Sequence, residues 1–184
     1  MVVIMYNTSS SSVITPPSGW ITLINGTSTS SGPGMGIFSR VKESGDTTFD
    51  FTRATAAFSA IMRIWSNDAT TASVGIGLPA AFNNINTNRT IPSITLTSPS
   101  LVLGIIHTSA PTADLTAPAT VEIISPTGFV LDEAKTEPTG SNYRNINRYS
   151  KQYATGETDP IIFRVTDSEG GGLSTSGIQL ALTV

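Results

Sequence analysis

The chain has 184 residues and a formal net charge of −3, with 12% charged residues, one histidine and no cysteine. This length is enough for one domain with a substantial core, and the missing cysteine excludes disulfides and thiolate metal sites. Lysine and arginine do not cluster, which argues against nucleic-acid binding. Ser, Thr, Gly, Asn and Pro replace the missing charges, as is typical of a turn-rich β protein.

Short apolar or alternating runs between turn residues predict two groups of strands. The first group comprises Val2–Tyr6, Trp20–Ile24, Gly36–Glu43, Thr47–Phe51, Ala57–Trp65 and Ala72–Leu78. The second group comprises Ser93–Thr97, Leu101–His107, Thr120–Ile124, Tyr143–Ala154, Ile161–Thr166 and Gly177–Val184. No window keeps a helical period between start and stop signals, so we expect an all-β protein.

Glycines and polar stretches predict the connections between these strands. Gly45-Asp46 and Gly156-Glu157 lie between paired runs and are interpreted as hairpin turns. Pro111–Ala119 has proline at both ends and is expected to be a loop or a short turn. Four polar stretches are predicted surface loops, where binding functions often reside: Thr8–Ser12, Thr27–Gly34, Asn83–Thr90 and Lys135–Asn142.

The second half of the chain repeats the landmarks of the first half in the same order. Pro17-Ser18-Gly19-Trp20 corresponds to Pro126-Thr127-Gly128-Phe129, and the Gly45 turn corresponds to the Gly156 turn, about 100 to 111 residues further on. That period is too long for a solenoid repeat, and two copies are too few to stack as one. We expect one two-sheet antiparallel β-sandwich domain over residues 1–184, with similar halves at about 1–91 and 92–184 that cover each other's apolar faces.

Candidate catalytic and metal-binding residues all have simpler structural interpretations. His107 ends an apolar strand, and without Cys or a second His it cannot nucleate a zinc site. The acid pairs are expected to face water, the adjacent ones pointing apart on an extended chain: Glu43 with Asp46, Asp132 with Glu133, and Glu157 with Asp159. We therefore predict no catalytic residue, no cofactor site and no metal site.

The glycine-rich stretches lack the following helix that a phosphate loop requires, so we interpret them as turns, bulges and a loop tip. They are Gly32–Gly36, Gly75–Gly77 and Gly170–Gly172. Asp167-Ser168-Glu169-Gly170 has too few acids for a calcium loop. The glycosylation-type triplets at Asn7, Asn25 and Asn88 carry no weight without a secretion signal. The first apolar segment is too short for such a signal or for a membrane span, so we expect assembly in a cytoplasm.

Aromatic residues provide the candidate interface. Trp20 and Trp65 lie in apolar strand contexts and are expected in the core. One predicted strand mixes aromatic and cationic residues, as protein interfaces do, although an amphipathic strand explains them nearly as well. The candidate interface residues are Tyr143, Arg144, Arg148, Tyr149 and Lys151.

Three sequence elements resemble a β-sandwich domain of tailed-phage virion proteins. They are PPSGWITLI, FSRVKESGDTTFDFT and AFSAIMRIWS, and the second half is similar to the latter part of that domain. The resemblance covers essentially the whole chain and implies a jelly-roll-like sandwich that decorates capsids or forms fibre modules. It implies a non-enzymatic capsid decoration (cement) protein on the virion surface. Its partners would be the major capsid protein and two further copies around a three-fold axis. A tail-fibre or receptor-binding module for host glycan is the alternative, and a glycan hydrolase is a weaker one.

Overall fold

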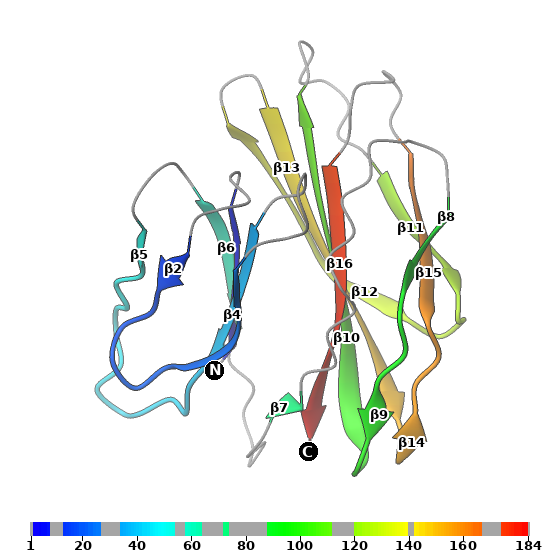
Figure 1. Ribbon diagram of the computed structural model, residues 1–184, viewed down its shortest axis with the longest axis horizontal. Helices are drawn as coiled ribbons and strands as arrows, with labels where there is room; N and C mark the ends of the chain where they lie inside the picture. The colour runs from blue at the N-terminus through cyan, green and yellow to red at the C-terminus, as the bar shows by residue number, and fades with distance from the viewer. Residues whose placement is uncertain are drawn as a thin grey trace.

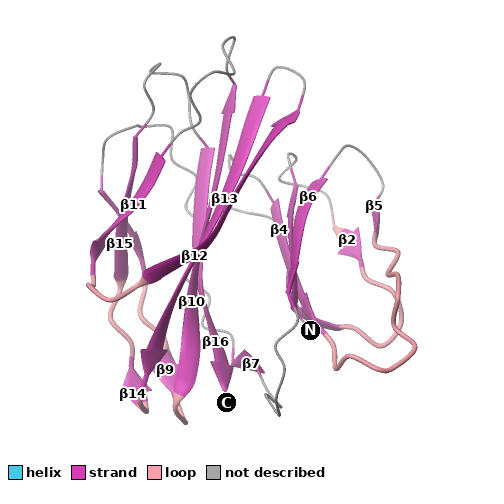
Figure 2. Ribbon diagram, turned by 180° about the vertical axis from the view of Figure 1, so that it is seen from behind, coloured by secondary structure: helices cyan, strands magenta, loops and turns pink. Residues whose placement is uncertain are grey.

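The computed structural model describes residues 2–7, 13–26, 34–53, 58–63, 72–73, 88–111, 120–139, 142–166 and 174–183. These residues contain strands and connections but no helix, and all strand pairs are antiparallel (Figures 1 and 2). The predicted all-β class and sandwich architecture are therefore confirmed. The jelly-roll-like topology stays a prediction.

The first half of the chain builds a four-stranded sheet in the order β3-β4-β1-β6, here called the first-half sheet. Its strands are β1 (Val2–Asn7), β3 (Ile21–Gly26), β4 (Gly34–Ser39) and β6 (Phe58–Arg63). A two-stranded pair covers its outer face, formed by β2 (Ile14–Thr15) and β5 (Thr52–Arg53).

The second half builds a five-stranded sheet in the order β12-β13-β10-β16-β7, here called the second-half sheet. Its strands are β7 (Ala72–Ser73), β10 (Ser100–Pro111), β12 (Val130–Thr139), β13 (Asn142–Tyr153) and β16 (Ser174–Thr183). Two smaller sheets, β11-β15-β8 and β14-β9, cover its outer face. Their strands are β8 (Asn88–Ile91), β9 (Thr95–Leu96), β11 (Thr120–Ser125), β14 (Gly156–Glu157) and β15 (Ile161–Thr166).

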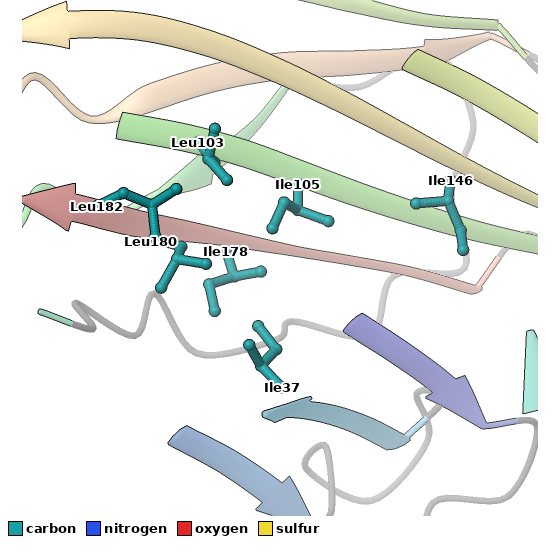
Figure 3. Close-up of a cluster of buried hydrophobic side chains, with 7 residues drawn as sticks. All are labelled: Ile37, Leu103, Ile105, Ile146, Ile178, Leu180 and Leu182. Carbon is teal, nitrogen blue, oxygen red and sulfur yellow. The ribbon is translucent and has the colours of Figure 1, made fainter. Parts of the chain in front are cut away.

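The two large sheets pack face to face in the middle of the molecule (Figure 1). Their shared core joins Ile37 of β4 to aliphatic side chains of β10, β13 and β16 (Figure 3). Strand β10 is buried on both faces, with Leu103 and Ile105 toward the shared core and Val102 and Ile106 toward the outer sheets. Burial on both faces explains why this strand is a continuous apolar run in the sequence.

Both halves have the same strand order, which confirms the predicted repeat. Strands β3, β4, β1 and β6 correspond in order to β12, β13, β10 and β16, and the β2–β5 pair corresponds to β11–β15. Even the β-bulges correspond. They lie between Thr22 and Ile24 and between Leu131 and Glu133, at the same offset that separates Gly19 from Gly128. The division between the halves differs from the prediction in one respect, because β8 pairs with β15 of the second half.

Several local predictions were wrong because tertiary pairing overrode local propensity. Lys135–Asn142 was expected to be a loop, but Lys135–Thr139 extend β12 against β13, and Asn142 begins β13. Asn88–Thr90 form β8 instead of the end of a loop. Gly156-Glu157 form β14, which pairs with β9. Conversely, Thr47–Phe51 is not a strand, although Phe49 and Phe51 both pack against the Trp20 ring.

Three of the four glycines predicted to lie in the turns of the repeat have left-handed backbone conformations. Gly19, Gly128 and Gly156 have φ of 84°, 91° and 113°. Gly45 lies in a turn closed by a hydrogen bond from Asp46 N to Glu43 O (3.2 Å), without the predicted flanking strands. Several other predictions fall outside the described residues: Thr8–Ser12, residues 27–33, Trp65, Gly75–Gly77, residues 112–119 and Asp167–Gly172.

A buried amide holds two connections onto the outer face of the second-half sheet. Gln179 of β16 is fully buried, and its Nε2 donates to the carbonyl oxygens of Pro92 (2.9 Å) and Asp159 (3.0 Å). Its Oε1 accepts from the Thr158 hydroxyl at 2.9 Å, and Thr158 in turn pairs with the backbone of Ile94. Because each polar group of this amide has a partner, its burial is compatible with a stable core.

Candidate interaction surface

The five predicted interface residues all belong to β13, but the structure separates their side chains. Tyr143 and Arg144 pair with Pro138 and Glu137 of β12, and their side chains lie outside the description. Arg148 and Tyr149 are adjacent and therefore point to opposite faces of the sheet. Both are buried, so their contacts lie within the chain. Lys151 is partly exposed, and the interface role remains a prediction for Tyr143, Arg144 and Lys151.

Tyr149 ties β13 to the outer sheet. Its ring packs in the cluster formed with Ile91, Ile106 and Phe163, and its hydroxyl donates to the Val121 carbonyl oxygen at 2.8 Å. Burial, with a further contribution from the Glu122 charge, raises the pKa of Tyr149. The side chain is therefore a neutral structural anchor.

Arg148 lies on the opposite face of β13 with two acidic partners. Its Nε is 3.5 Å from Asp132 Oδ2, and its Nη1 is 3.8 Å from Glu133 Oε2. Asp132 also accepts a hydrogen bond from the Ser150 hydroxyl at 2.9 Å. The expectation that these adjacent acids point apart was wrong, because the bulge between Leu131 and Glu133 breaks the alternation of the strand.

Lys151 is the centre of a second polar group, here called the Lys151 cluster, with Phe129, Tyr153 and Asp159. Its Nζ lies 4.7 Å from the Tyr153 ring centroid, 5.9 Å from that of Phe129 and 3.8 Å from Asp159 Oδ2. The Tyr153 hydroxyl donates to Asp159 Oδ2 at 3.3 Å. Burial and the Asp159 charge raise the pKa of Tyr153 to about 12.

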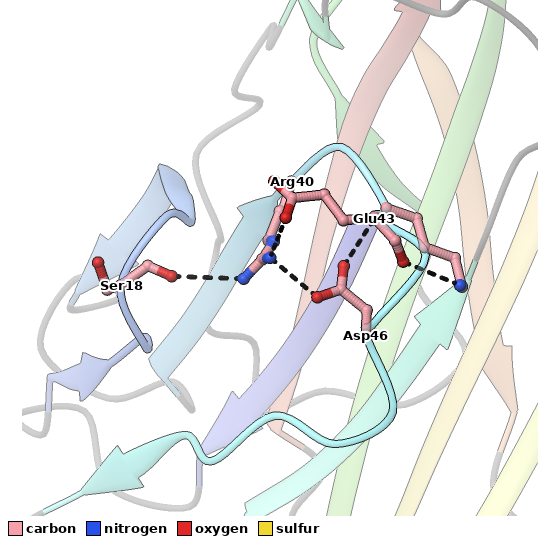
Figure 4. A network of polar contacts seen from close by, with 5 residues as sticks. Ser18, Arg40, Glu43 and Asp46 are labelled. Carbon is pink, nitrogen blue, oxygen red and sulfur yellow. Dashed lines mark hydrogen bonds and ion pairs between the residues drawn. The ribbon is translucent and has the colours of Figure 1, made fainter.

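The first half carries a corresponding group, the Arg40 cluster, with Phe49, Asp46 and Ser18. Figure 4 shows its polar contacts among Ser18, Arg40, Glu43 and Asp46. The Arg40 guanidinium lies 5.5 Å from the Phe49 ring centroid, and its Nη2 is 2.9 Å from Asp46 Oδ1. Its Nη1 donates to the Ser18 carbonyl oxygen at 3.5 Å. The second oxygen of Asp46 accepts from the Glu43 backbone at 2.8 Å. These contacts fix the turn from Glu43 to Asp46.

A positive-φ glycine lies beneath the cation in each cluster. A β-carbon placed on Gly19 would lie 3.6 Å from Arg40 Nη1, and one on Gly128 would lie 3.6 Å from Lys151 Cε. The two Pro-x-Gly-aromatic turns predicted from the sequence therefore hold equivalent cations. The sequence identified these turns but not the clusters, because Arg40 and Lys151 are distant from them along the chain.

Exposed aliphatic side chains follow both turns. Ile21 and Val130 are the first residues of the edge strands β3 and β12, and each is 63% exposed. Leu131 and Val41 are also exposed. We call Ile21 with the Arg40 cluster, and Val130 with the Lys151 cluster, the two turn patches. In each patch the exposed aliphatic residue pairs with the residue just before the cation (Ile21 with Ser39, Val130 with Ser150), so the aliphatic and cationic side chains leave opposite faces of the sheet near the same turn. Aliphatic and ion-paired side chains at one turn are a composition suited to protein contacts.

The other candidate sites have local structural partners. His107 is buried on β10, opposite Ile146. Glu157 accepts a hydrogen bond from the Ser93 hydroxyl, and the Asn25 side chain exchanges two hydrogen bonds with the backbone of Ile14. Within the described residues, no three His, Cys, Asp or Glu side chains gather where they could hold a metal ion. Nor does this part of the chain contain a helix long and apolar enough to span a membrane.

Comparison of the chain with protein-family models, with curated proteins and with solved structures gave no significant match. The functional interpretation therefore depends on the residues and their arrangement.

Proposed function

We propose that this chain is a non-enzymatic virion structural protein, a decoration protein that binds and stabilises the assembled capsid of a tailed bacteriophage. The observation that carries the proposal is the pair of turn patches. Ile21 and Val130 present apolar surface on turns that ion pairs and left-handed glycines hold in place. Apolar side chains on a preorganised backbone favour protein association, because little conformational entropy is lost on binding.

The mechanism would be mass action. A subunit that binds only the assembled shell stabilises that state by about 4 kcal/mol per site when its concentration is a thousandfold above Kd. Many such sites together would resist the internal pressure of packaged DNA. The major capsid protein is the proposed partner, and association of the decoration protein around a three-fold axis is part of the same proposal.

The burial of Trp20 supports this function over a glycan-binding one. A sugar-stacking platform needs an exposed aromatic ring, whereas Trp20 is only 8% exposed and packs edge-on against Phe49 and Phe51. The described members of the three acid pairs also have local partners, including Arg40 for Asp46, Arg148 for Asp132 and Lys151 for Asp159. These contacts give each carboxylate a structural role.

The copy number in purified virions tests the proposal. Quantitative mass spectrometry against the major capsid protein is expected to find hundreds of copies per particle, and a few dozen or fewer would overturn it in favour of a tail component. Particles lacking the protein are expected to lose thermostability and to regain it when purified protein is added. The variant with Ile21→Asp and Val130→Asp is expected to bind such particles at least tenfold more weakly, whereas Asn88→Asp, at the exposed first residue of β8, is the control and is expected to bind as the wild type.

A further inference from the structure

The equivalence of the two halves reveals a group of three neighbouring positions where their chemistry differs. Ile37 of β4 pairs with Ile4 and Ile24, and Arg148 of β13 pairs with Ile105 and Glu133. Since β4 corresponds to β13, Arg148 takes the place of Ile37.

The acidic partners of Arg148 also replace apolar residues. Glu133 takes the place of Ile24, and Asp132, within the bulge, takes that of Leu23. In the first half, Leu23 and Ile24 are partly buried and pack against the shared core with Ile37. In the second half, the three equivalent positions form one ion cluster.

This ion cluster lies on the face of the second-half sheet that meets the first half. Ile146, two residues before Arg148 on the same strand, points to that face and belongs to the shared core with Ile37. The Arg148 side chain is 9% exposed, and those of Asp132 and Glu133 are 27% and 24% exposed. Removing such charges from water is unfavourable, and well-packed apolar residues of similar size are often equally or more stabilising. Stability alone therefore does not account for the cluster.

The repeat itself creates a problem of partner choice. Each half has the same strand order, so the second halves of two chains could pack together in the way that the two halves of one chain do. In that arrangement Arg148 of one chain would lie against the other chain's aliphatic side chains that normally contact Ile37. These include Ile105, Ile178 and Leu180. A guanidinium that is ion-paired with two carboxylates cannot fill an apolar site that accommodates an isoleucine. Packing of two second halves against each other is therefore energetically unfavourable.

We propose that Asp132, Glu133 and Arg148 form a pairing-specificity element. It directs the second half of the chain to pack against a first half and prevents it from packing against the second half of another copy. The element is independent of capsid binding.

The test installs the first-half residues in the second half of the full chain. The variant D132L/E133I/R148I and the wild type are refolded from urea over a hundredfold range of protein concentration, and their masses are measured by light scattering after gel filtration. The wild type is expected to return to one oligomeric state at all concentrations. The variant is expected to form additional larger species, whose fraction rises at least severalfold over that range. Cross-linking of mixed isotope-labelled and unlabelled chains is expected to join β13 of one chain to β13 of another.

Two further variants separate pairing specificity from other effects. E122L/R164I replaces an exposed ion pair (2.7 Å) on the outer sheet with the same kinds of apolar residue and is expected to refold as the wild type. The near-isosteric variant D132N/E133Q/R148M removes the charges with little change of shape and is expected to form the larger species even if the first variant does not refold. The proposal is overturned if the neutral variant refolds as the wild type. It is also overturned if E122L/R164I forms the same species, or if no cross-links join two second halves.

Discussion

The Thr158 hydroxyl donates a hydrogen bond to Gln179 Oε1 at 2.9 Å, deep beneath the outer sheets of the second half. Through this bond and those to Pro92 and Asp159, one side chain of β16 holds the connections before β9 and after β14. A polar residue in the middle of an apolar strand is therefore a structural requirement.

Gln179→Leu is expected to lower the free energy of unfolding by about 2–4 kcal/mol, because it leaves buried oxygens without a donor. Urea denaturation followed by circular dichroism measures the change. Gln152→Leu, at an exposed position near the end of β13, is the control and is expected to change stability by less than about 0.5 kcal/mol. Equal stability of the two variants would show that the buried amide is dispensable.

Gly177 is expected to tolerate no side chain. A β-carbon there would lie 2.7 Å from Ile91 Cδ1, 2.9 Å from Ile91 Cγ1 and 3.3 Å from Phe163 Cε1. Gly177→Ala should therefore cost about 1–3 kcal/mol through overpacking between β16 and the outer sheet. Gly45→Ala is the matched control, since no atom lies within 4 Å of its β-carbon position. A Gly177→Ala variant as stable as Gly45→Ala in thermal unfolding would contradict this packing.

The two turn glycines are expected to respond alike to substitution. Gly19→Ala and Gly128→Ala place a β-carbon on backbones with φ of 84° and 91°, at an expected cost of about 1–2 kcal/mol each. Asparagine tolerates this conformation better, so Gly19→Asn and Gly128→Asn should lose less stability. Chemical denaturation of the four variants measures whether the asparagine variants lose less stability than the alanine variants. If alanine and asparagine were equivalent at either site, the left-handed conformation would not be what requires glycine.

Tyr153 is expected to make stability fall at alkaline pH. Its pKa is about 12 in the folded chain, because of burial and the Asp159 charge, against an ordinary value of about 10. Since the folded pKa is the higher one, the contribution is fully present below about pH 10 and is lost as the pH rises toward 12. Absorbance titration of the wild type minus Tyr153→Phe reports its ionisation, and urea midpoints from pH 9 to 11.5 report the stability.

The Tyr153→Phe variant should show a weaker decline in stability over the same range, because it lacks the ionising hydroxyl. A difference titration centred near pH 10 would mean that the Lys151 cluster does not hold the tyrosine in its neutral form.

Much of the architecture could be read from local patterns. The apolar run of β10, the alternation in β15 and the two Pro-x-Gly-aromatic turns predict strands and corners, because these depend on neighbouring residues. The polar strand β12 could not be predicted in this way. Its Lys, Glu and Pro residues disfavour a strand, and only pairing with β13 extends it.

The candidate interface likewise combines features that local sequence predicts with features that only tertiary contacts determine. The sequence placed Arg148, Tyr149 and Lys151 on one strand, but burial of both sheet faces turned the first two into internal contacts. The partners of Lys151 come from the turn before β12, from β13 and from the connection after β14, and no spacing predicted their meeting.

The sequence by itself determined the all-β class, the repeat and the glycine corners, because backbone conformation and strand period are local properties. Only the tertiary structure decided which side chains meet across the sheets and that one bulge brings Asp132 and Glu133 to Arg148. It also decided that this charged group lies where the first half has isoleucine and leucine. Those contacts join residues that are distant along the chain, and the packing of one half on the other selects them.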